Sequence, residues 1–313
     1  MPAYVRRSCV LLLVLFIALA VTQAQAAERG VIVREGVMYV APDKTSAKLW
    51  TVERGRELVL LEKSHDWLHV IELLPGAAEH TGWMLSKGII FPSQAHADEI
   101  IFGAAADAEA EAAKAGGRNG AAEDAIRLYS WLAENMKTSP LAGEALYRAA
   151  DDRWQLERAD RWSRPSAKRH DPDWTADISE DYVRQVMKRY PRTKWADLAA
   201  YDLIDNKKCP DWTVGPECAE KEAKAYEKYA DERPQSPKAA ESLFEAAWRQ
   251  SALSAMLKTA EEPKKAADAK AKAQELASRI LSQYPQQADW SARAQTLLYF
   301  LQQDIPTFGL AVE

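Results

Sequence analysis

The chain has 313 residues, with 41 basic and 46 acidic side chains and a formal net charge of −5. A mildly acidic chain is poorly suited to non-specific nucleic-acid binding, which depends on neutralising phosphates with basic residues. The length allows about two domains, each of which can bury a hydrophobic core.

The first predicted element is a secretory signal peptide at residues 1–26. Two arginines precede an apolar run from Val10 to Val21, and an Ala-Gln-Ala triplet ends the segment. This order is typical of a cleaved signal peptide, and the apolar run is too short to span a bilayer comfortably. We therefore expect a secreted, periplasmic protein that does not span the membrane after cleavage. Retention of the segment as an anchor is the alternative.

Residues 30–92 carry the pattern of a small β domain. The stretches VIVREGVMYVAP and RELVLLEKSHDWLHVIEL are rich in β-branched and aromatic residues, and glycines and prolines interrupt them. Such spacing is typical of short strands joined by turns.

The order of motifs in this region resembles that of bacterial SH3-like domains. A Pro/Ser turn, a basic-Gly turn, a central W-x-x-V strand and a closing Gly-Trp pair follow one another, although Met-Tyr-Val replaces the family's opening Asn-Val-Arg. The resemblance implies a small β-barrel that binds cell-wall peptide or glycan, or another protein. The candidate ligand contacts are Tyr39, Trp67 and Trp83. The alternative is that the two tryptophans pack in the core or at the rim of a barrel too small for aliphatic filling alone.

A partly helical linker is expected at residues 93–120, and from residue 121 to 305 the apolar period becomes helical. One phrase recurs in this second region, as TSPLAGEALYRAA, YPRTKWADLAAYDLI, QSPKAAESLFEAA and, less closely, YPQQADWSARAQTLL. Each copy begins near a Ser or Thr that could cap a helix, and each follows another amphipathic segment. The unit is therefore a helix, a short turn and a second helix.

This unit resembles tetratricopeptide-type repeats, in particular those of periplasmic outer-membrane assembly lipoproteins and of the Tol–Pal-associated protein. The match is to the turn and second helix of such repeats, at Tyr190, Pro191, Thr193, Ala196, Ala199 and Tyr201. The copies are spaced more widely than the period of about 34 residues of this repeat class, and insertions account for the excess. The resemblance implies an all-α solenoid that docks partner proteins. The expected fold class is thus multidomain, an SH3-like β-barrel followed by a helical solenoid.

Two cysteines remain after the signal peptide, Cys209 and Cys218, separated by a loop that contains Pro and Gly. An even pair in an oxidising compartment predicts a disulfide that staples this loop. A metal site would need two further ligands, and no other Cys or His lies nearby in the sequence.

No arrangement of catalytic residues, cofactor contacts or metal ligands is found. The chain lacks a phosphate-binding glycine loop, a nucleophile elbow and an HExxH motif. His65 and His69 flank Trp67 across a predicted turn, so no zinc site is expected there. The acidic pairs at 151–152, 180–181 and 261–262 are expected at helix starts, on polar faces or between elements, where carboxylates are solvated.

An insertion carries the stretch RWSRPSAKRH, which gathers Arg161, Trp162, Arg164 and Arg169 in an otherwise acidic chain. A basic, aromatic patch suits an anionic polymer or an acidic peptide. A solvated loop between repeats is the alternative. The whole pattern favours a non-enzymatic cell-envelope adaptor whose partners are envelope proteins and peptidoglycan. A peptidoglycan hydrolase, or a regulator of one, is the opposing hypothesis.

Overall fold

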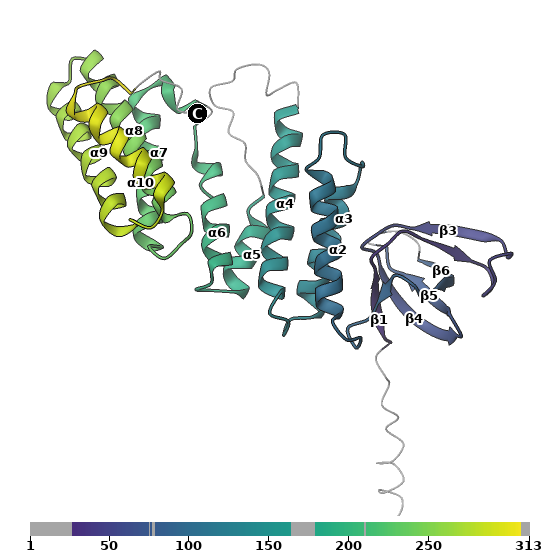
Figure 1. The fold of residues 1–313 in the computed structure, drawn as a ribbon. Coiled ribbons are helices and arrows are strands. Elements are labelled where there is room, and N and C mark those ends of the chain that lie inside the picture. Colours follow the sequence, from purple (N-terminus) through teal and green to yellow (C-terminus); the bar gives the residue numbers. More distant parts are fainter. Residues whose placement is uncertain (1–26, 75, 77–78, 164–178, 210, 308–313) are drawn as a thin grey trace, which may run out of the picture. The chain divides into compact units, whose positions relative to one another are not determined.

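The computed structural model describes residues 27–74, 76, 79–163, 179–209 and 211–307, with the backbone alone for 161–163. The chain divides into two compact units, on either side of the bond between Ala97 and Asp98. The first unit is a curled antiparallel sheet and the second is helical (Figure 1). The predicted signal peptide lies outside the described residues. Among those that are described, no helix is long and apolar enough to cross a membrane.

The first unit is a single seven-stranded sheet in which every neighbouring pair of strands is antiparallel. The strand order is β3-β2-β6-β5-β4-β1-β7, so β3 and β7 form the two edges. The strands are β1 (Arg29–Ile32), β2 (Gly36–Tyr39), β3 (Lys48–Val52), β4 (Glu57–Ser64), β5 (Trp67–Glu72), β6 (His80–Leu85) and β7 (Ile89–Ile90).

Alternation along the strands builds the core of the sheet. In β5, Leu68 and Val70 are buried, whereas Trp67 and His69 on the other face are partly exposed. The turn before β4 contains Gly55 at a φ of 79°, a conformation that favours glycine, at the basic-Gly turn expected from the sequence. The core consists of Ile32, Met38, Val52, Leu58, Leu68, Val70, Met84, Ile89 and Phe91.

The second unit is helical throughout its described length apart from turns. Its helices are α2 (Ala97–Ala112), α3 (Ala121–Asn135), α4 (Ala142–Ser163), α5 (Asp181–Arg189), α6 (Lys194–Asp202), α7 (Pro216–Glu232), α8 (Ala239–Thr259), α9 (Pro263–Gln283) and α10 (Ala288–Gln302). Two short 3-10 turns, η2 (Asp205–Lys207) and η3 (Trp212–Val214), lie between α6 and α7.

The repeated phrase forms the turn and second helix of successive helix pairs. Contacts join α3 to α4, α5 to α6, α7 to α8 and α9 to α10. Thr193 caps α6 as predicted, because its side-chain oxygen accepts a hydrogen bond from the amide of Ala196. In the other two close copies, Ser139 and Ser236 instead accept from the amide two residues later, within the turn before the helix. The phrase therefore marks the turn more reliably than the first helical residue.

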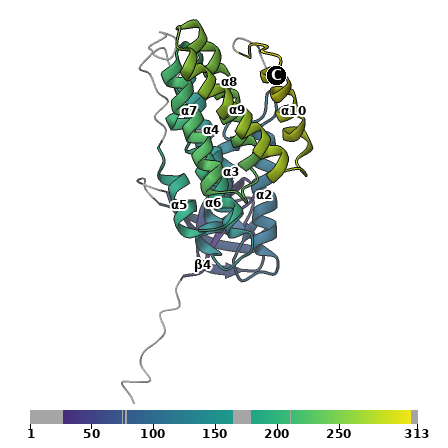
Figure 2. The same ribbon diagram turned by 90° about the vertical axis from the view of Figure 1, so that its left-hand side faces the viewer.

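Small and aromatic residues both pack between these helices. Most alanines of the three close copies are buried, which lets neighbouring helices approach closely, whereas Ala288 and Ala292 of the last copy are exposed. The ring of Tyr201 on α6 lies 5.3 Å from that of Tyr229 on α7, so the aromatic position of the phrase joins one helix pair to the next. Figure 2 shows α7, α8 and α9 running side by side, in agreement with their contacts.

Helix α2 packs against α3 within the helical unit. The ring of Phe102 on α2 lies 5.2 Å from that of Tyr129 on α3, and the Tyr129 hydroxyl donates a 2.7 Å hydrogen bond to Glu109. The segment that the sequence placed in a partly helical linker thus includes a 16-residue helix that contacts α3.

Candidate functional site

The three ligand contacts predicted in the β unit lie together on one face of the sheet. Tyr39 on β2 is in register with Trp83 on β6, and Trp83 is in register with His69 on β5. The His69 and Trp83 rings stack with centroids 4.9 Å apart and planes 14° apart, and the Tyr39 and Trp67 rings meet edge to face at 5.5 Å. We call these four side chains, Tyr39, Trp67, His69 and Trp83, the aromatic row.

The aromatic row lies on the face opposite the core of the sheet, and all its members are partly exposed. Of the alternative that the two tryptophans pack in the core or at the rim, the structure does not show the core part, because strand alternation directs Leu68, Val70 and Met84 there instead. The row depends on a close approach of β2 to β6 at Gly82. A Cβ at Gly82 would lie 2.5 Å from the Met38 side chain and 2.8 Å from the Tyr39 carbonyl oxygen, so another residue would displace β2.

Partly exposed rings on a sheet can bind ligands. Aromatic faces stack on apolar surfaces of a partner, and indole N–H groups can donate hydrogen bonds at the edge of the contact. The side chains of the predicted basic patch all lie outside the described part of the chain. They are those of Arg161, Trp162, Arg164 and Arg169.

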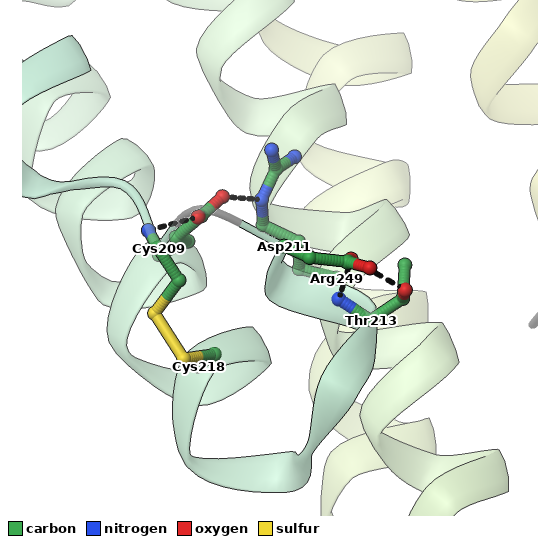
Figure 3. Close-up of a disulfide and its surroundings, with 6 residues drawn as sticks. Cys209, Asp211, Thr213, Cys218 and Arg249 are labelled. Carbon is green, nitrogen blue, oxygen red and sulfur yellow. Dashed lines mark hydrogen bonds and ion pairs between the residues drawn. A yellow bond between two sulfur atoms is a disulfide. The ribbon is translucent and has the colours of Figure 1, made fainter. Parts of the chain in front are cut away.

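The predicted disulfide is present between Cys209 and Cys218, whose Cα atoms are 6.0 Å apart (Figure 3). Next to it, the Cys209 amide donates a 2.8 Å hydrogen bond to Glu222 on α7. The other oxygen of that carboxylate accepts a 2.7 Å hydrogen bond from Nε of Arg249 on α8. The Glu222 and Arg249 side chains are 1% and 7% exposed, so the disulfide loop is joined to a buried ion pair.

The rest of the disulfide loop is also tied to the helices. Asp211 accepts hydrogen bonds from the amide and the hydroxyl of Thr213, which closes a local turn (Figure 3). The ring of Trp212 lies 4.9 Å from the Arg249 guanidinium, and the ring of Tyr226 lies 4.6 Å from it. The loop is therefore held by covalent, ionic and cation–π contacts around one arginine.

Carboxylates on α4 and α6 are partly buried, although the sequence predicted that the pair at 151–152 is solvated. The pairs at 180–181 and 261–262 do lie at the start of α5 and between α8 and α9. Asp151 and Asp152, by contrast, are partly buried within α4. Among the described residues, one side-chain oxygen of Asp152 and one of Asp202 on α6 are buried without a hydrogen-bond partner.

Burial controls the ionisation of these carboxylates. Burial, together with the nearby carboxylates of Asp151 and Asp205, raises the pKa of Asp202 to about 8. Burial likewise raises the pKa of Asp152 to about 7, with Glu109 and Asp151 adding to the effect. These two carboxyls hold protons near neutral pH because the charged form is poorly solvated in their surroundings.

The Asp202→Asn variant is expected to be more stable than the wild type at pH 8, by about 1–2 kcal/mol after allowance for solvent screening. In the folded chain Asp202 keeps a proton that the unfolded chain releases above its ordinary pKa of 3.8. The free energy of unfolding of the wild type should therefore fall as the pH rises from about 4 to about 8.

Urea unfolding at pH 5, 6, 7 and 8 measures this effect. The slope against pH should be reduced in Asp202→Asn and unchanged in Asp107→Asn, which replaces an exposed carboxylate on α2. Equal slopes in the Asp202→Asn variant and the wild type would contradict the raised pKa of Asp202.

In the part of the chain that the structure describes, no three His, Cys, Asp or Glu side chains converge on a possible ion. His80 instead faces the buried Glu72, with Nδ1 3.1 Å from the carboxylate, and its ring lies 4.1 Å from that of Trp50.

Comparison with known proteins identifies no family. No protein-family model matches the chain, and no curated protein matches it. One solved structure with similarity, described as "DHF79 filament", is 18% identical over 64% of this chain and 95% of its own, with a TM-score of 0.22. A TM-score this low carries no argument about fold or function.

Proposed function

We propose that the protein is a secreted, non-enzymatic adaptor of the cell envelope. Its β unit, an SH3-like domain, contacts wall material or a protein through the aromatic row, and its helical unit, a tetratricopeptide-like solenoid, docks envelope proteins. The observation that carries the proposal is the aromatic row, since Tyr39, Trp67, His69 and Trp83 stay partly exposed although the core beneath them is complete without them.

The helical unit supports the same proposal through its construction from repeated helix pairs. Such pairs bury their apolar faces by stacking on one another, and the stack presents long continuous surfaces to partners. The disulfide between Cys209 and Cys218 is consistent with an oxidising, extracytoplasmic compartment.

Replacing Trp67 with alanine is expected to weaken binding to purified peptidoglycan sacculi by about tenfold or more, because a stacked aromatic contact contributes on the order of 1–2 kcal/mol. Co-sedimentation of the full chain with sacculi measures the bound fraction. The control is Trp50→Ala, which removes an exposed tryptophan on β3 that is not part of the aromatic row. Wild-type protein that stays in the supernatant would rule out wall binding. Equal losses of binding in both variants would rule out the aromatic row as the binding surface.

The competing hypothesis, a peptidoglycan hydrolase, predicts a different result with the same reagents. Lysis of sacculi in a zymogram by the purified chain would overturn the adaptor proposal. A regulator of such an enzyme would give no lysis alone but would change the lysis produced by an added hydrolase.

A further inference from the structure

A groove of about 450 Å³ runs between α7 and α9, with α8 as its floor. Leu253 and Leu257 on α8 and Ala269 on α9 form its apolar part and belong to one small hydrophobic cluster. All three side chains are more than nine-tenths buried, so the floor offers only shallow apolar contacts.

Gln250 places an amide in this floor. Its side chain lines the groove and is only 8% exposed. Within the described residues, this amide makes no hydrogen bond. The amide nitrogen and oxygen of Gln250 are not among the fully buried unpaired atoms of the described residues, so a donor and an acceptor are both accessible at the groove. Gln250 can therefore pair with the N–H and C=O of a main chain that enters the groove.

Acidic side chains dominate the rims of the groove. Glu217 and Glu220 lie on α7, and Glu262 and Asp268 lie on or beside α9, against two lysines, Lys265 and Lys272. Both lysines are already neutralised, Lys265 by Glu262 and Lys272 by Glu227 and Glu275.

Two carboxylates remain uncompensated, one on each rim. Glu220 is paired with Lys224, at 2.6 Å. For Glu217 and Asp268, no ion pair occurs within the part of the chain that the structure describes. The groove thus has a negative field with one exposed carboxylate on each side, which attracts a cationic side chain.

The disulfide holds one rim in place. Glu217 directly precedes Cys218, whose bond to Cys209 fixes the first turn of α7. Ala219 packs in the same cluster as Leu253 and Leu257, and Trp212 from the disulfide loop packs against that cluster. A rim fixed before binding loses little conformational entropy when a ligand arrives.

We infer that this groove binds a short extended segment of a partner protein that carries a Lys or Arg side chain. The cation lies between Glu217 and Asp268, an apolar neighbour contacts Leu253 and Leu257, and the segment's main chain pairs with Gln250. The inference rests on the proposed function, because it names the kind of segment that the helical unit takes from its partner.

Selection of a random octapeptide phage library on the immobilised full chain at 150 mM salt, a condition at which long-range attraction is screened beyond about 8 Å, tests the inference. The selected peptides are expected to be enriched in Lys and Arg. A fluorescein-labelled synthetic copy of the most enriched peptide is then measured by fluorescence anisotropy.

Glu217→Gln with Asp268→Asn is expected to raise the Kd of that peptide about tenfold or more, and Gln250→Leu should raise it without loss of fold. The control is Asp107→Asn with Glu134→Gln, which removes two exposed charges from α2 and α3 and should leave the Kd unchanged. Circular dichroism confirms that each variant is folded.

Selected peptides without cationic enrichment, failure to select any peptide, or equal effects of the two double variants would overturn the inference. Each of these results would leave the adaptor proposal standing, because the sacculus experiment concerns the aromatic row of the other unit. Loss of sacculus binding with retained peptide binding would contradict wall binding by the aromatic row and leave the groove inference standing.

Discussion

The Arg249→Met variant is expected to lose about 3–5 kcal/mol of unfolding free energy, because it leaves the buried Glu222 carboxylate without its counter-charge. Glu222 is 1% exposed, and its oxygens accept hydrogen bonds from Arg249 and from the Cys209 amide. Loss of the guanidinium also removes the cation–π contacts with Trp212 and Tyr226. Methionine is chosen because it fills much of the same volume without a charge.

Urea unfolding followed by tryptophan fluorescence measures the loss. The double variant Glu222→Gln with Arg249→Met provides the control, since glutamine retains an acceptor for the Cys209 amide and carries no charge. We expect it to be more stable than Arg249→Met alone, because no unpaired charge is then buried. A loss of less than about 1 kcal/mol in Arg249→Met, within the range of exposed ion pairs, would contradict the buried assignment.

The contrast between Glu222 and Asp151 shows what sequence patterns can reveal about buried charge. Glu222 shares the face of α7 that carries Ala219, Ala223 and Tyr226, all buried. A carboxylate on an apolar helix face is a signal that could have predicted the ion pair, although the partner on α8 depends on how the two helices meet. For Asp151 the signal is weaker, because it lies between Tyr147 and the buried Trp154 on one face of α4 but is itself only partly buried.

The β unit shows a similar division. Turns such as the one at Gly55 are readable from the sequence, because one backbone conformation demands glycine. The face on which Trp67 and Trp83 lie cannot be predicted from the sequence, because both faces of β5 carry apolar residues. Leu68 and Val70 alternate with Trp67 and Ile71, so periodicity alone does not decide which set is inside. The structure decides it through the register with β4 and β6.

Replacing both Cys209 and Cys218 with serine is expected to lower the free energy of unfolding by about 2–3 kcal/mol through loop closure, and by more in total because the Cys209 amide also leaves Glu222. The two residues are nine positions apart, and the crosslink restricts the unfolded chain by closing this short loop. The same loss should follow reduction of the wild-type protein, because reduction frees the loop without changing any other side chain. Reaction of both cysteines with a thiol reagent in the purified, unreduced protein would contradict the disulfide.

The size of this loss distinguishes two roles for the disulfide. If the crosslink acts only on the unfolded chain, the loss stays near the loop-closure value and the Glu222–Arg249 pair remains intact. If the crosslink also holds the loop in place, the Cys209 amide leaves Glu222, and the loss should approach that of Arg249→Met. Combining the serine substitutions with Arg249→Met separates these cases, since independent effects add and coupled effects do not. We expect coupling, because one carboxylate accepts hydrogen bonds from both the disulfide loop and Arg249.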